Sequence, residues 1–495
     1  MTEGKHVGVI GGGLAGLTSA LLLARNGYTV TLVEKSRQVG LTLRGFYRQG
    51  TYFDTGLHYT GGLAENGIVS RYLRYLGFDA LELVAFDDAG FDEIYFEDTG
   101  KRVRLPVGYE RITASLQADF PEEAEAVAAY MQAARDGFAS SSLLRFFMDA
   151  KGGMEALQAQ SGCSLKEYLD TITDTPHLRA TLAIHSLLYG CSPAETPFVQ
   201  HSYVAASYYD SVHNFVGGGG ALIKAFEQRL AEEGVTVITG NGVRRIVCDG
   251  KRRVTGLELE DGETIPVEGC ICTAHPASLA MMAGDLFRPA YLKWLRGLED
   301  TASAYMFFGI AETRPDCLRG RNLFLCRGPE LENAFGGRMT PEHGPFYVAT
   351  SPQPDPKAKA GIVVVAPGSF SHVAQWADSS RGKRPAAYVA YKEGVATRVR
   401  DSLVRLCPEL EAVRFVEAAT PLTMRDYLDA PQGGLYGCKH TVAHFNPLPV
   451  TRSPNLWLAG QSVIAPGLMG AMISGFLACG FLLGHSTLQR EMTCL

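Results

Sequence analysis

The first forty residues change from one hydrophobic pattern to another in a defined order. Residues 7–10 form a short apolar run, residues 14–25 are rich in Leu and Ala, and residues 29–33 form a second apolar run. A short run fits a buried strand, whereas the longer Leu- and Ala-rich stretch fits a helix. Because parallel strands need a crossover connection, this order predicts a β–α–β unit at the N-terminus.

Similar patterns recur along the chain. Helix-like spacing occurs in three stretches between residues 109 and 214, and residues 287–420 mix strand and helix patterns. The prolines of residues 351–356 predict an exposed loop. The sequence therefore predicts an α/β fold. One helix is expected to begin at Pro121, and others are expected over residues 165–169 (after Ser164), 177–188, 221–230 and 472–483. Further strands are expected over residues 235–238, 243–246, 306–310, 361–365 and 455–459.

Glycines occur where the first predicted strand meets the first helix, in the pattern Gly11-x-Gly13-x-x-Gly16. Gly11 permits a tight turn, Gly13 lets a pyrophosphate approach the backbone, and Gly16 lets the helix lie close to the strand. The phosphates would bind the free N–H groups at the helix start. Glu34 ends the second strand, where a carboxylate can accept hydrogen bonds from an adenosine ribose. A glycine-rich turn alone would not explain why a strand, the glycines, a helix, a second strand and an acid follow one another in this order. The sequence therefore predicts a dinucleotide site.

The residues after Glu34 resemble a known group of flavoproteins. Glu34-Lys35-x-x-x-x-Gly40, then Gly50 and Phe53-Asp54-x-Gly56, is similar to the segment found in amine oxidases and phytoene desaturases. The motif Phe53-Asp54-Thr55-Gly56-Leu57-His58-Tyr59, with Gly61-Gly62, resembles carotenoid isomerases and retinol saturases more closely. Leu41 departs from the group, which usually has a second glycine there. The resemblance implies that the dinucleotide is FAD.

The C-terminal segment resembles the same group. Residues 455–461 predict a strand ending in Gly460-Gln461, and Pro466-Gly467-x-x-Gly470-Ala471 predicts the start of a long helix. A helix start carries a partial positive charge, which the resemblance places near the flavin pyrimidine edge. Residues 217–220 lack a preceding strand and acid, so they predict a close-packed turn and not a second dinucleotide site. The resemblance implies FAD contacts from Gly11, Gly13, Leu14, Ala15, Gly16, Glu34, Lys35, Gly40, Leu41, Arg44, Gly56, Leu57, His58, Val243, Gly460, Gln461, Gly467, Met469, Gly470 and Ala471.

Candidate catalytic residues come from the motifs expected to face the flavin. These are His58, Tyr59 and Tyr436, the last from Gly433-Gly434-Leu435-Tyr436-Gly437. A proton donor close to the substrate is needed for saturation, desaturation or isomerisation of a C=C bond. His58 could instead be a structural histidine bonded to the backbone. A second group of candidates for substrate contact is His201, Tyr208 and Tyr209, with Tyr203 nearby, for which an aromatic core strip is the alternative, and His185 and Cys191 carry less weight.

The three flavin segments are separated by two long insertions, so we expect discontinuous domains. Residues 1–108, 215–286 and 421–495 are predicted to form a Rossmann-like FAD-binding domain. Residues 109–214 and 287–420 are predicted to form an α+β substrate domain with a helical cap.

Composition and charge indicate which partners and which cellular location to expect. The net charge is −6 with no basic cluster, so nucleic acid is not an expected partner. The eleven cysteines contain no CxxC pair, and no metal-ligand spacing is present, so we expect a reduced, cytoplasmic protein without a metal. No secretory signal precedes the first strand, and no apolar run is long enough to span a bilayer. Residues 142–148, Ser-Leu-Leu-Arg-Phe-Phe-Met, could contact a membrane surface or form a core helix.

Three classes of function remain open from the sequence. The first is an FAD-dependent oxidoreductase or isomerase that acts on C=C bonds of a long apolar, conjugated substrate such as a carotenoid or retinoid, with an external electron donor or acceptor. The second is a flavin amine or amino-acid oxidase, which shares the fold. The third is a non-enzymatic lipid carrier, as in prenyl-protein escort factors. The motifs around His58 and Tyr436 favour the first class.

Overall fold

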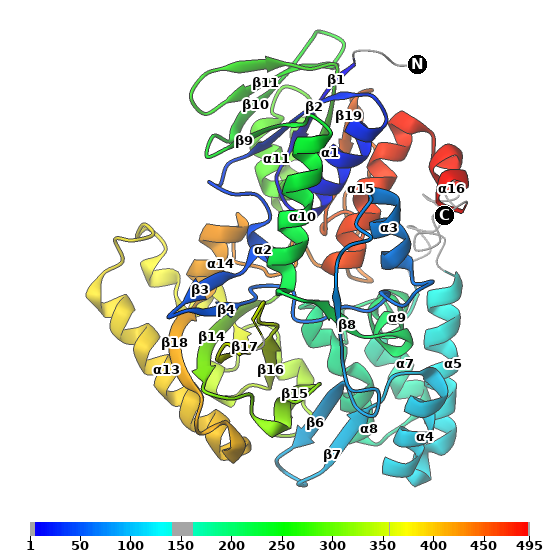
Figure 1. The fold of residues 1–495 in the computed structure, drawn as a ribbon, viewed down its shortest axis with the longest axis vertical. Coiled ribbons are helices and arrows are strands. Elements are labelled where there is room, and N and C mark those ends of the chain that lie inside the picture. Colours follow the sequence, from blue (N-terminus) through cyan, green and yellow to red (C-terminus); the bar gives the residue numbers. More distant parts are fainter. Residues whose placement is uncertain (1–4, 141–161, 356, 494–495) are drawn as a thin grey trace.

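A parallel sheet of five strands takes its strands from three separate parts of the chain (Figure 1). The computed structural model describes residues 5–140, 162–355 and 357–493. Each neighbouring pair of strands in this sheet is parallel, and β1 lies in the middle. The order is β19 (Leu456–Leu458), β13 (Gly269–Cys272), β1 (His6–Ile10), β2 (Thr29–Glu34) and β9 (Thr236–Thr239).

Two apolar helices from opposite ends of the chain pack against each other in this half of the molecule. They are α1 (Leu14–Arg25) and α15 (Gly467–Leu483), and most of their residues are buried. A β-carbon on Gly475 would lie 2.9 Å from the carbonyl oxygen of Ala15, so only glycine permits this close crossing. The other helices here are α3 (Ile68–Leu76), α10 (Gly218–Glu232), α11 (Pro276–Met282), α12 (Pro289–Arg296) and α16 (His485–Thr493), and a small sheet contains β10 (Val243–Cys248), β11 (Val254–Leu259) and β12 (Thr264–Pro266).

In the described part of the chain, no single helix is long and apolar enough to cross a membrane. Helices α15 and α16 taken together are long and apolar enough by length and composition alone, but the chain bends by 119° between them.

A second sheet of seven strands forms the other half of the molecule (Figure 1). Its neighbouring strands are antiparallel except for the parallel pair β15 and β6. The order is β18 (Arg414–Ala419), β14 (Ser303–Ala311), β17 (Ala360–Gly368), β16 (Phe346–Ser351), β15 (Asn322–Cys326), β6 (Asp92–Phe96) and β7 (Arg102–Leu105).

Both faces of the seven-stranded sheet are covered by helices, and the side chains of β15 alternate between them. Leu323 and Leu325 lie in one core with residues of α13 (Ala386–Leu406). Phe324 and Cys326 point to the opposite face and lie in a core with the helical group. This explains why the strand is apolar at each position from Leu323 to Cys326. The helical group contains α4 (Tyr109–Asp119), α5 (Ala124–Ser140), α7 (Leu165–Ile172), α8 (Pro176–Ala183) and α9 (Phe198–Asp210).

Short elements connect the two halves. The hairpin β3–β4 packs its second strand on β17, and β5 pairs with β8 across a long sequence separation. These connections bring the segment around His58 beside the helical group. The short elements are α2 (Leu41–Arg44), β3 (Phe46–Arg48), β4 (Thr51–Phe53), β5 (Leu83–Ala85), β8 (His213–Phe215) and α14 (Pro421–Leu428).

Many predicted elements are confirmed. The first helix spans residues 14–25 as predicted, and the strands predicted at 306–310 and 361–365 pair with each other in β14 and β17. Ser164 caps α7 with a capping box, in which its side chain accepts from Glu167 N and Glu167 accepts from Ser164 N. The membrane-contact candidate at residues 142–148 lies outside the described residues.

The domain boundaries differ from the predicted ones at three places. Strands β6 and β7, predicted within the FAD-binding domain, belong to the seven-stranded sheet because β6 pairs with β15. Helix α12, predicted in the substrate domain, buries Leu292 and Leu295 in the core of the five-stranded sheet. Helix α14 places Met424 in a core with Met306 and Phe308 of the seven-stranded sheet. Short elements near a boundary follow the core that can bury their apolar residues.

Candidate active site

The first glycine motif forms a tight turn at the carboxyl end of β1. Gly11 has a φ of +100°, and a β-carbon there would meet the hydroxyl of Thr273. A β-carbon on Gly16 would overlap the carbonyl oxygen of Gly11, so glycine is required where the helix meets the turn. A β-carbon on Gly13, by contrast, would meet no described heavy atom within 4 Å. The open side of Gly13 and the N-terminus of α1 form a cradle for a diphosphate.

Glu34 lies at the end of β2 beside this turn. Its carboxylate accepts hydrogen bonds from Gly12 N at 2.6 Å and from Ser36 N at 2.7 Å. Each oxygen has a further lone pair that a ribose hydroxyl can reach. The carboxylate is thus fixed in place and still able to accept, as a nucleoside ribose requires.

The C-terminal segment brings a second helix N-terminus to the same edge of the sheet. Gly460 follows β19 with a φ of +110°, and its N–H donates to Ser474 Oγ at 2.8 Å. A β-carbon on Gly467, at the start of α15, would meet no described atom within 4 Å. The backbone carbonyl of Gln461 accepts from His440 Nε2 at 2.8 Å, and this contact does not involve the side-chain amide of Gln461. Glycines with open sides and free N–H groups of two helices fit a dinucleotide cofactor.

Two predicted cofactor residues already have side-chain partners. Lys35 Nζ pairs with Asp429 Oδ1 at 2.5 Å, and the guanidinium of Arg44 pairs with Glu227. Gly40 has a φ of +68° with Ile223 beside it, which explains a glycine at that turn. Of the remaining predicted residues, Leu14, Ala15, Leu57 and Gly470 are buried, Leu41, Val243, Met469 and Ala471 are half-buried, and Gly56 is exposed.

Tyr59 forms a hydrogen bond with a buried acidic residue, Asp92. Its hydroxyl donates to Asp92 Oδ2 at 2.9 Å, and the same oxygen lies 3.1 Å from His185 Nε2. Asn322 Nδ2 donates to the other oxygen of Asp92 at 3.0 Å. Burial raises the pKa of Tyr59 well above its usual value, and the charge of Asp92 adds to this effect. The proton of Tyr59 is therefore directed at Asp92.

Four aromatic side chains lie near one another beside Tyr59, and we call His58, Tyr208, Tyr347 and Tyr436 the aromatic site. The ring of Tyr208 lies 4.6 Å from that of Tyr59, and the ring of His58 lies 5.6 Å from that of Tyr347. The hydroxyls of Tyr208, Tyr347 and Tyr436 and the Nδ1 of His58 make no hydrogen bond to a described residue. These four side chains bring unpaired polar atoms to one aromatic region.

Burial sets the charge state of the aromatic site. It lowers the pKa of His58 to about 4 and raises the pKa of Tyr436 to about 12. Burial also raises the pKa of Tyr208 and Tyr347, and the neighbouring tyrosines contribute to both shifts. At neutral pH the histidine is therefore uncharged and the tyrosines keep their protons.

The loop that carries Tyr436 lies against the C-terminal cofactor segment. The N–H of Cys438 donates to Ser462 Oγ at 3.0 Å, and a β-carbon on Gly437 would overlap the same hydroxyl. Tyr436 N donates to Thr301 Oγ1 at 3.0 Å on its other side. These contacts hold Tyr436 beside the residues that follow Gln461.

Two predicted substrate residues lie behind the aromatic site. Both ring nitrogens of His201 are used, Nε2 by Tyr130 at 2.8 Å and Nδ1 by Tyr189 at 2.9 Å. The hydroxyl of Tyr209 lies 3.3 Å from that of Tyr130. His201 and Tyr209 are buried and have their polar atoms paired, so they form the aromatic core that was the alternative. Tyr208, one residue before Tyr209, points to the site because neighbours on a helix face different directions.

Asp92, Tyr347 and Asp54 also belong to the site, although none of them was predicted from the sequence as a site residue. Asp92 follows Phe91 and opens a strand that ends with Tyr95 and Phe96, and an acid in such a setting is a signal of a buried, paired carboxylate. Tyr347 gives no signal in the sequence, because its contact with His58 depends on the order of strands in the seven-stranded sheet.

Asp54 fixes the segment that leads to His58. Its Oδ1 accepts from Tyr52 Oη at 2.7 Å and from Gly219 N at 2.9 Å, at the start of α10. A β-carbon on Gly218 would collide with this carboxylate, which explains part of the glycine run. Burial raises the pKa of Asp54 to about 7, although these hydrogen bonds act in the opposite direction.

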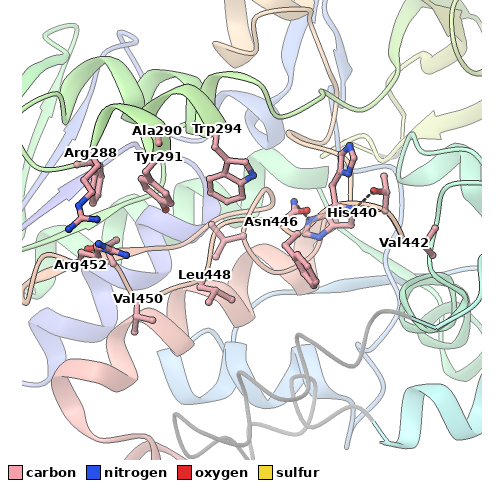
Figure 2. A pocket seen from close by; sticks show the side chains of 16 residues that line it. Arg288, Ala290, Tyr291, Trp294, His440, Val442, Asn446, Leu448, Val450 and Arg452 are labelled. Atoms are coloured by element: carbon pink, nitrogen blue, oxygen red, sulfur yellow. Dashed lines mark hydrogen bonds between the residues drawn. The ribbon is translucent and has the colours of Figure 1, made fainter.

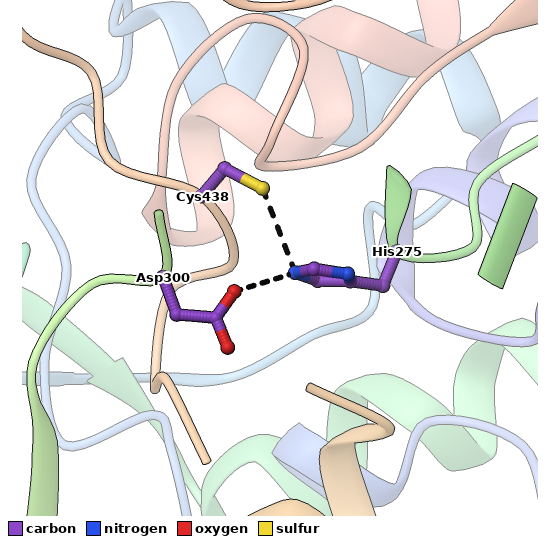
Figure 3. A group of neighbouring side chains, drawn as sticks. All are labelled: His275, Asp300 and Cys438. Atoms are coloured by element: carbon purple, nitrogen blue, oxygen red, sulfur yellow. Dashed lines mark hydrogen bonds and ion pairs between the residues drawn. The ribbon is translucent and has the colours of Figure 1, made fainter. Parts of the chain in front are cut away.

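A separate cluster of His275, Asp300 and Cys438 has the residue types of a metal site (Figure 3). His275 Nε2 lies 2.8 Å from Asp300 Oδ1 and 3.5 Å from Cys438 Sγ. However, His275 Nδ1 accepts from Ala277 N at 3.2 Å, so Nε2 is the ring nitrogen that donates to Asp300. A metal-binding histidine normally donates from its second nitrogen, and this one accepts. The geometry therefore favours a hydrogen-bonded clamp between the end of β13 and the Tyr436 loop.

The fold and the two cofactor segments define a flavoprotein oxidoreductase with FAD as its cofactor. The sequence matches the family of flavin containing amine oxidoreductases over residues 14–329, and the chain belongs to this family. The predicted α/β flavoprotein fold, the enzyme class and the FAD cofactor are confirmed.

Relatives in sequence extend across nearly the whole chain. The chain is 25% identical to all-trans-retinol 13,14-reductase of Macaca fascicularis over 96% of this chain and 85% of that protein. It is 24% identical to 4,4'-diapophytoene desaturase (4,4'-diaponeurosporene-forming) of Staphylococcus haemolyticus over 92% of this chain and 94% of that protein. The solved structure of cyclohexylamine oxidase from Brevibacterium oxydans has a TM-score of 0.63 at 14% identity, covering 99% of both chains. The predicted resemblance to phytoene desaturases and retinol saturases is confirmed.

Proposed function

We propose that this protein is an FAD-dependent enzyme that acts on the C=C bonds of a long apolar, conjugated substrate, such as a retinoid or carotenoid. The reaction would be saturation, desaturation or cis–trans isomerisation. The sequence relatives support this proposal, because their names describe a retinol reductase and a carotenoid-precursor desaturase.

The observation that carries the proposal is the uncharged aromatic character of the site. The pKa values of His58, about 4, and Tyr436, about 12, leave both side chains neutral at physiological pH. Aromatic rings and neutral polar atoms suit a conjugated hydrocarbon, whereas an unpaired charge there would be costly.

We assign the residues different roles in this reaction. Bound FAD supplies the hydride or electron exchange. The Tyr436 hydroxyl has no described hydrogen-bond partner and keeps its proton, so it is the preferred donor to a substrate carbon. His58 would orient the substrate or a water through its unpaired Nδ1. Tyr59 is a positioning residue, because its hydroxyl is held by Asp92.

The amine-oxidase alternative rests on the family match and on the fold. Cyclohexylamine oxidase has the same fold at 14% identity, a similarity that carries no information about the substrate of this chain. The lipid-carrier alternative requires a lost cofactor site, and here the positions of Gly13 and Gly467 are open toward a cofactor.

Partners and location follow from the same proposal. The described residues contain one dinucleotide unit, at Gly11 to Glu34, so the electrons would come from or go to an external partner. We propose a cytoplasmic enzyme that collects an apolar substrate at a membrane surface.

Product analysis tests the proposal. Holoenzyme in its oxidised form and after anaerobic photoreduction is incubated with all-trans retinol, a linear carotenoid and a polyenoic acid. Products are then separated by chromatography and weighed by mass spectrometry. A gain of two hydrogens indicates saturation, a loss of two indicates desaturation, and an unchanged mass at a new retention time indicates isomerisation. Recovery of every substrate unchanged from both forms would contradict the proposal.

A further inference from the structure

A pocket of about 880 Å³ lies between α12 and the segment that precedes β19 (Figure 2). This volume falls in the range of about 300–1,000 Å³ that is typical of small-molecule sites. Its lining contains none of the residues of the aromatic site and none of the predicted cofactor residues. We call it the α12 pocket.

One wall of the α12 pocket is a row of aromatic rings. Phe287 and Tyr291 have ring centroids 5.0 Å apart, and Tyr291 and Trp294 have centroids 5.2 Å apart. Leu448 and Val450 lie across from them in Figure 2. Trp294 keeps 36% of its surface exposed, a large value for a side chain of this size in the absence of a ligand. The wall can bury an apolar chain.

Two arginines lie at one end of this apolar wall. Arg288 and Arg452 both line the pocket and lie at the same end in Figure 2. Both are exposed, and among the described residues neither has an ion pair with a carboxylate. Like charges at one end of a pocket repel each other, and an anion bound at that end would reduce this cost. A guanidinium pairs well with a carboxylate or phosphate through two parallel hydrogen bonds.

The opposite end of the pocket is lined by neutral groups that are fixed by hydrogen bonds. His440 Nε2 donates to the carbonyl of Gln461, and Asn446 Nδ2 donates to the carbonyl of Ser462 at 2.9 Å. Burial lowers the pKa of His440, so the ring is neutral at physiological pH. Of the lining residues, the two arginines carry a permanent charge.

We propose that the α12 pocket binds one anionic amphiphile, with the carboxylate or phosphate head between Arg288 and Arg452 and the apolar chain along Tyr291 and Trp294. The site is separate from the aromatic site, so the proposal does not depend on the reaction catalysed there. Its head group could come from a free fatty acid or from a membrane lipid, and we commit to the free amphiphile.

Calorimetric titration of the holoenzyme tests the site. Laurate, dodecyl phosphate and 1-dodecanol share a saturated chain, and only the first two carry a negative charge. We expect laurate and dodecyl phosphate to bind with one molecule per chain, and dodecanol to bind at least about tenfold more weakly, since two charge-assisted contacts are lost. Equal affinities for laurate and dodecanol would overturn the role of the arginines, and no binding of any probe would overturn the site.

Variants locate the binding. The double variant Arg288→Gln/Arg452→Gln should lose at least about tenfold in laurate affinity. Lys293→Gln removes an exposed charge from the same helix but not from the pocket, and should leave the affinity within about twofold. Trp294→Ala should weaken laurate and dodecanol alike. An equal loss in Lys293→Gln, or a loss in His58→Gln instead, would place the binding elsewhere and overturn the proposal.

A vesicle arm separates the two sources of the head group. Flotation with phosphatidylcholine vesicles, with and without phosphatidylglycerol, measures attachment to a membrane. If the arginine variant loses attachment to the phosphatidylglycerol vesicles while wild-type protein does not bind free laurate, the pocket is a membrane contact and the proposal is wrong.

Discussion

The hydroxyl of Tyr59 lies 2.9 Å from Oδ2 of Asp92, and this hydrogen bond distinguishes Tyr59 from the tyrosines of the aromatic site. Tyr436 has no such partner among the described residues, and its loop lies against the cofactor segment at Ser462. The two tyrosines therefore have different expected roles, although both come from motifs that the sequence analysis linked to catalysis.

The first prediction separates these roles. Tyr436→Phe should lower the turnover of a polyene by about 10²- to 10⁴-fold, the usual contribution of a general acid, without loss of FAD. Tyr59→Phe should instead lower the free energy of unfolding by about 1–3 kcal/mol, because Asp92 loses one donor. Turnover and thermal unfolding are measured for both variants. Equal turnover in wild type and Tyr436→Phe would remove Tyr436 from the reaction.

The second prediction concerns Glu34. Replacing Glu34 with Gln weakens a charge-assisted hydrogen bond to the ribose, which costs about 1.5–3 kcal/mol. FAD affinity should fall about ten- to a hundredfold in titrations of apoprotein. Glu411→Gln, at an exposed position, serves as the control and should leave the affinity unchanged. An unchanged affinity in Glu34→Gln would show that this carboxylate does not contact the ribose.

A third prediction uses two glycines of one motif. The β-carbon of Gly13→Ala meets no described atom, so this variant should keep its stability and lose FAD affinity, because the methyl group would occupy the diphosphate cradle. The β-carbon of Gly16→Ala would overlap the Gly11 carbonyl, so this variant should unfold more easily even as apoprotein. Thermal unfolding of apoprotein and FAD titration distinguish the two effects. Tight FAD binding by Gly13→Ala would place the diphosphate elsewhere.

The fourth prediction concerns pH. Burial lowers the pKa of His58 from 6.5 to about 4, so the folded state binds a proton less readily than the unfolded chain. The stability from the neutral ring is fully present above pH 6.5 and is lost as the pH falls toward 4. At pH 5 the loss should be about 2 kcal/mol relative to pH 7.

Comparison of wild type with His58→Gln isolates this effect from other titrating groups. The variant should lose about 2 kcal/mol less than wild type between pH 7 and pH 5, measured by chemical unfolding. The same loss in both proteins would mean that His58 is not desolvated as the structure shows.

The cofactor half of the molecule could be predicted well because its signals are local. The turn at Gly11, the helix from Leu14 and the acid at Glu34 follow one another in the sequence, and each has a physical requirement that the structure meets. The site beyond the cofactor could be predicted only in part. Tyr59, Asp92 and Tyr347 come from three distant segments, and their contact depends on strand pairing that no local pattern contains.

The same dependence on the fold explains why the predicted substrate residues could not be told apart from the sequence. Tyr208 and Tyr209 are neighbours of the same type, and only the packing of α9 decides that one faces the site and the other binds Tyr130. The α12 pocket gave no signal in the sequence, because Arg288 and Arg452 are far apart in the chain and meet only in the fold.

The most direct test of the central claim is an anaerobic comparison of polyenes and amines on the same holoenzyme. Reduced and oxidised enzyme are mixed separately with retinoids, carotenoids and polyenoic acids, and oxidised enzyme is mixed with a panel of primary amines, while absorption spectra are recorded. We predict a change in the absorption band of at least one polyene and no bleaching of the flavin by any amine. Unchanged spectra for every polyene, together with rapid bleaching of the flavin by a primary amine, would contradict the account and identify an amine oxidase.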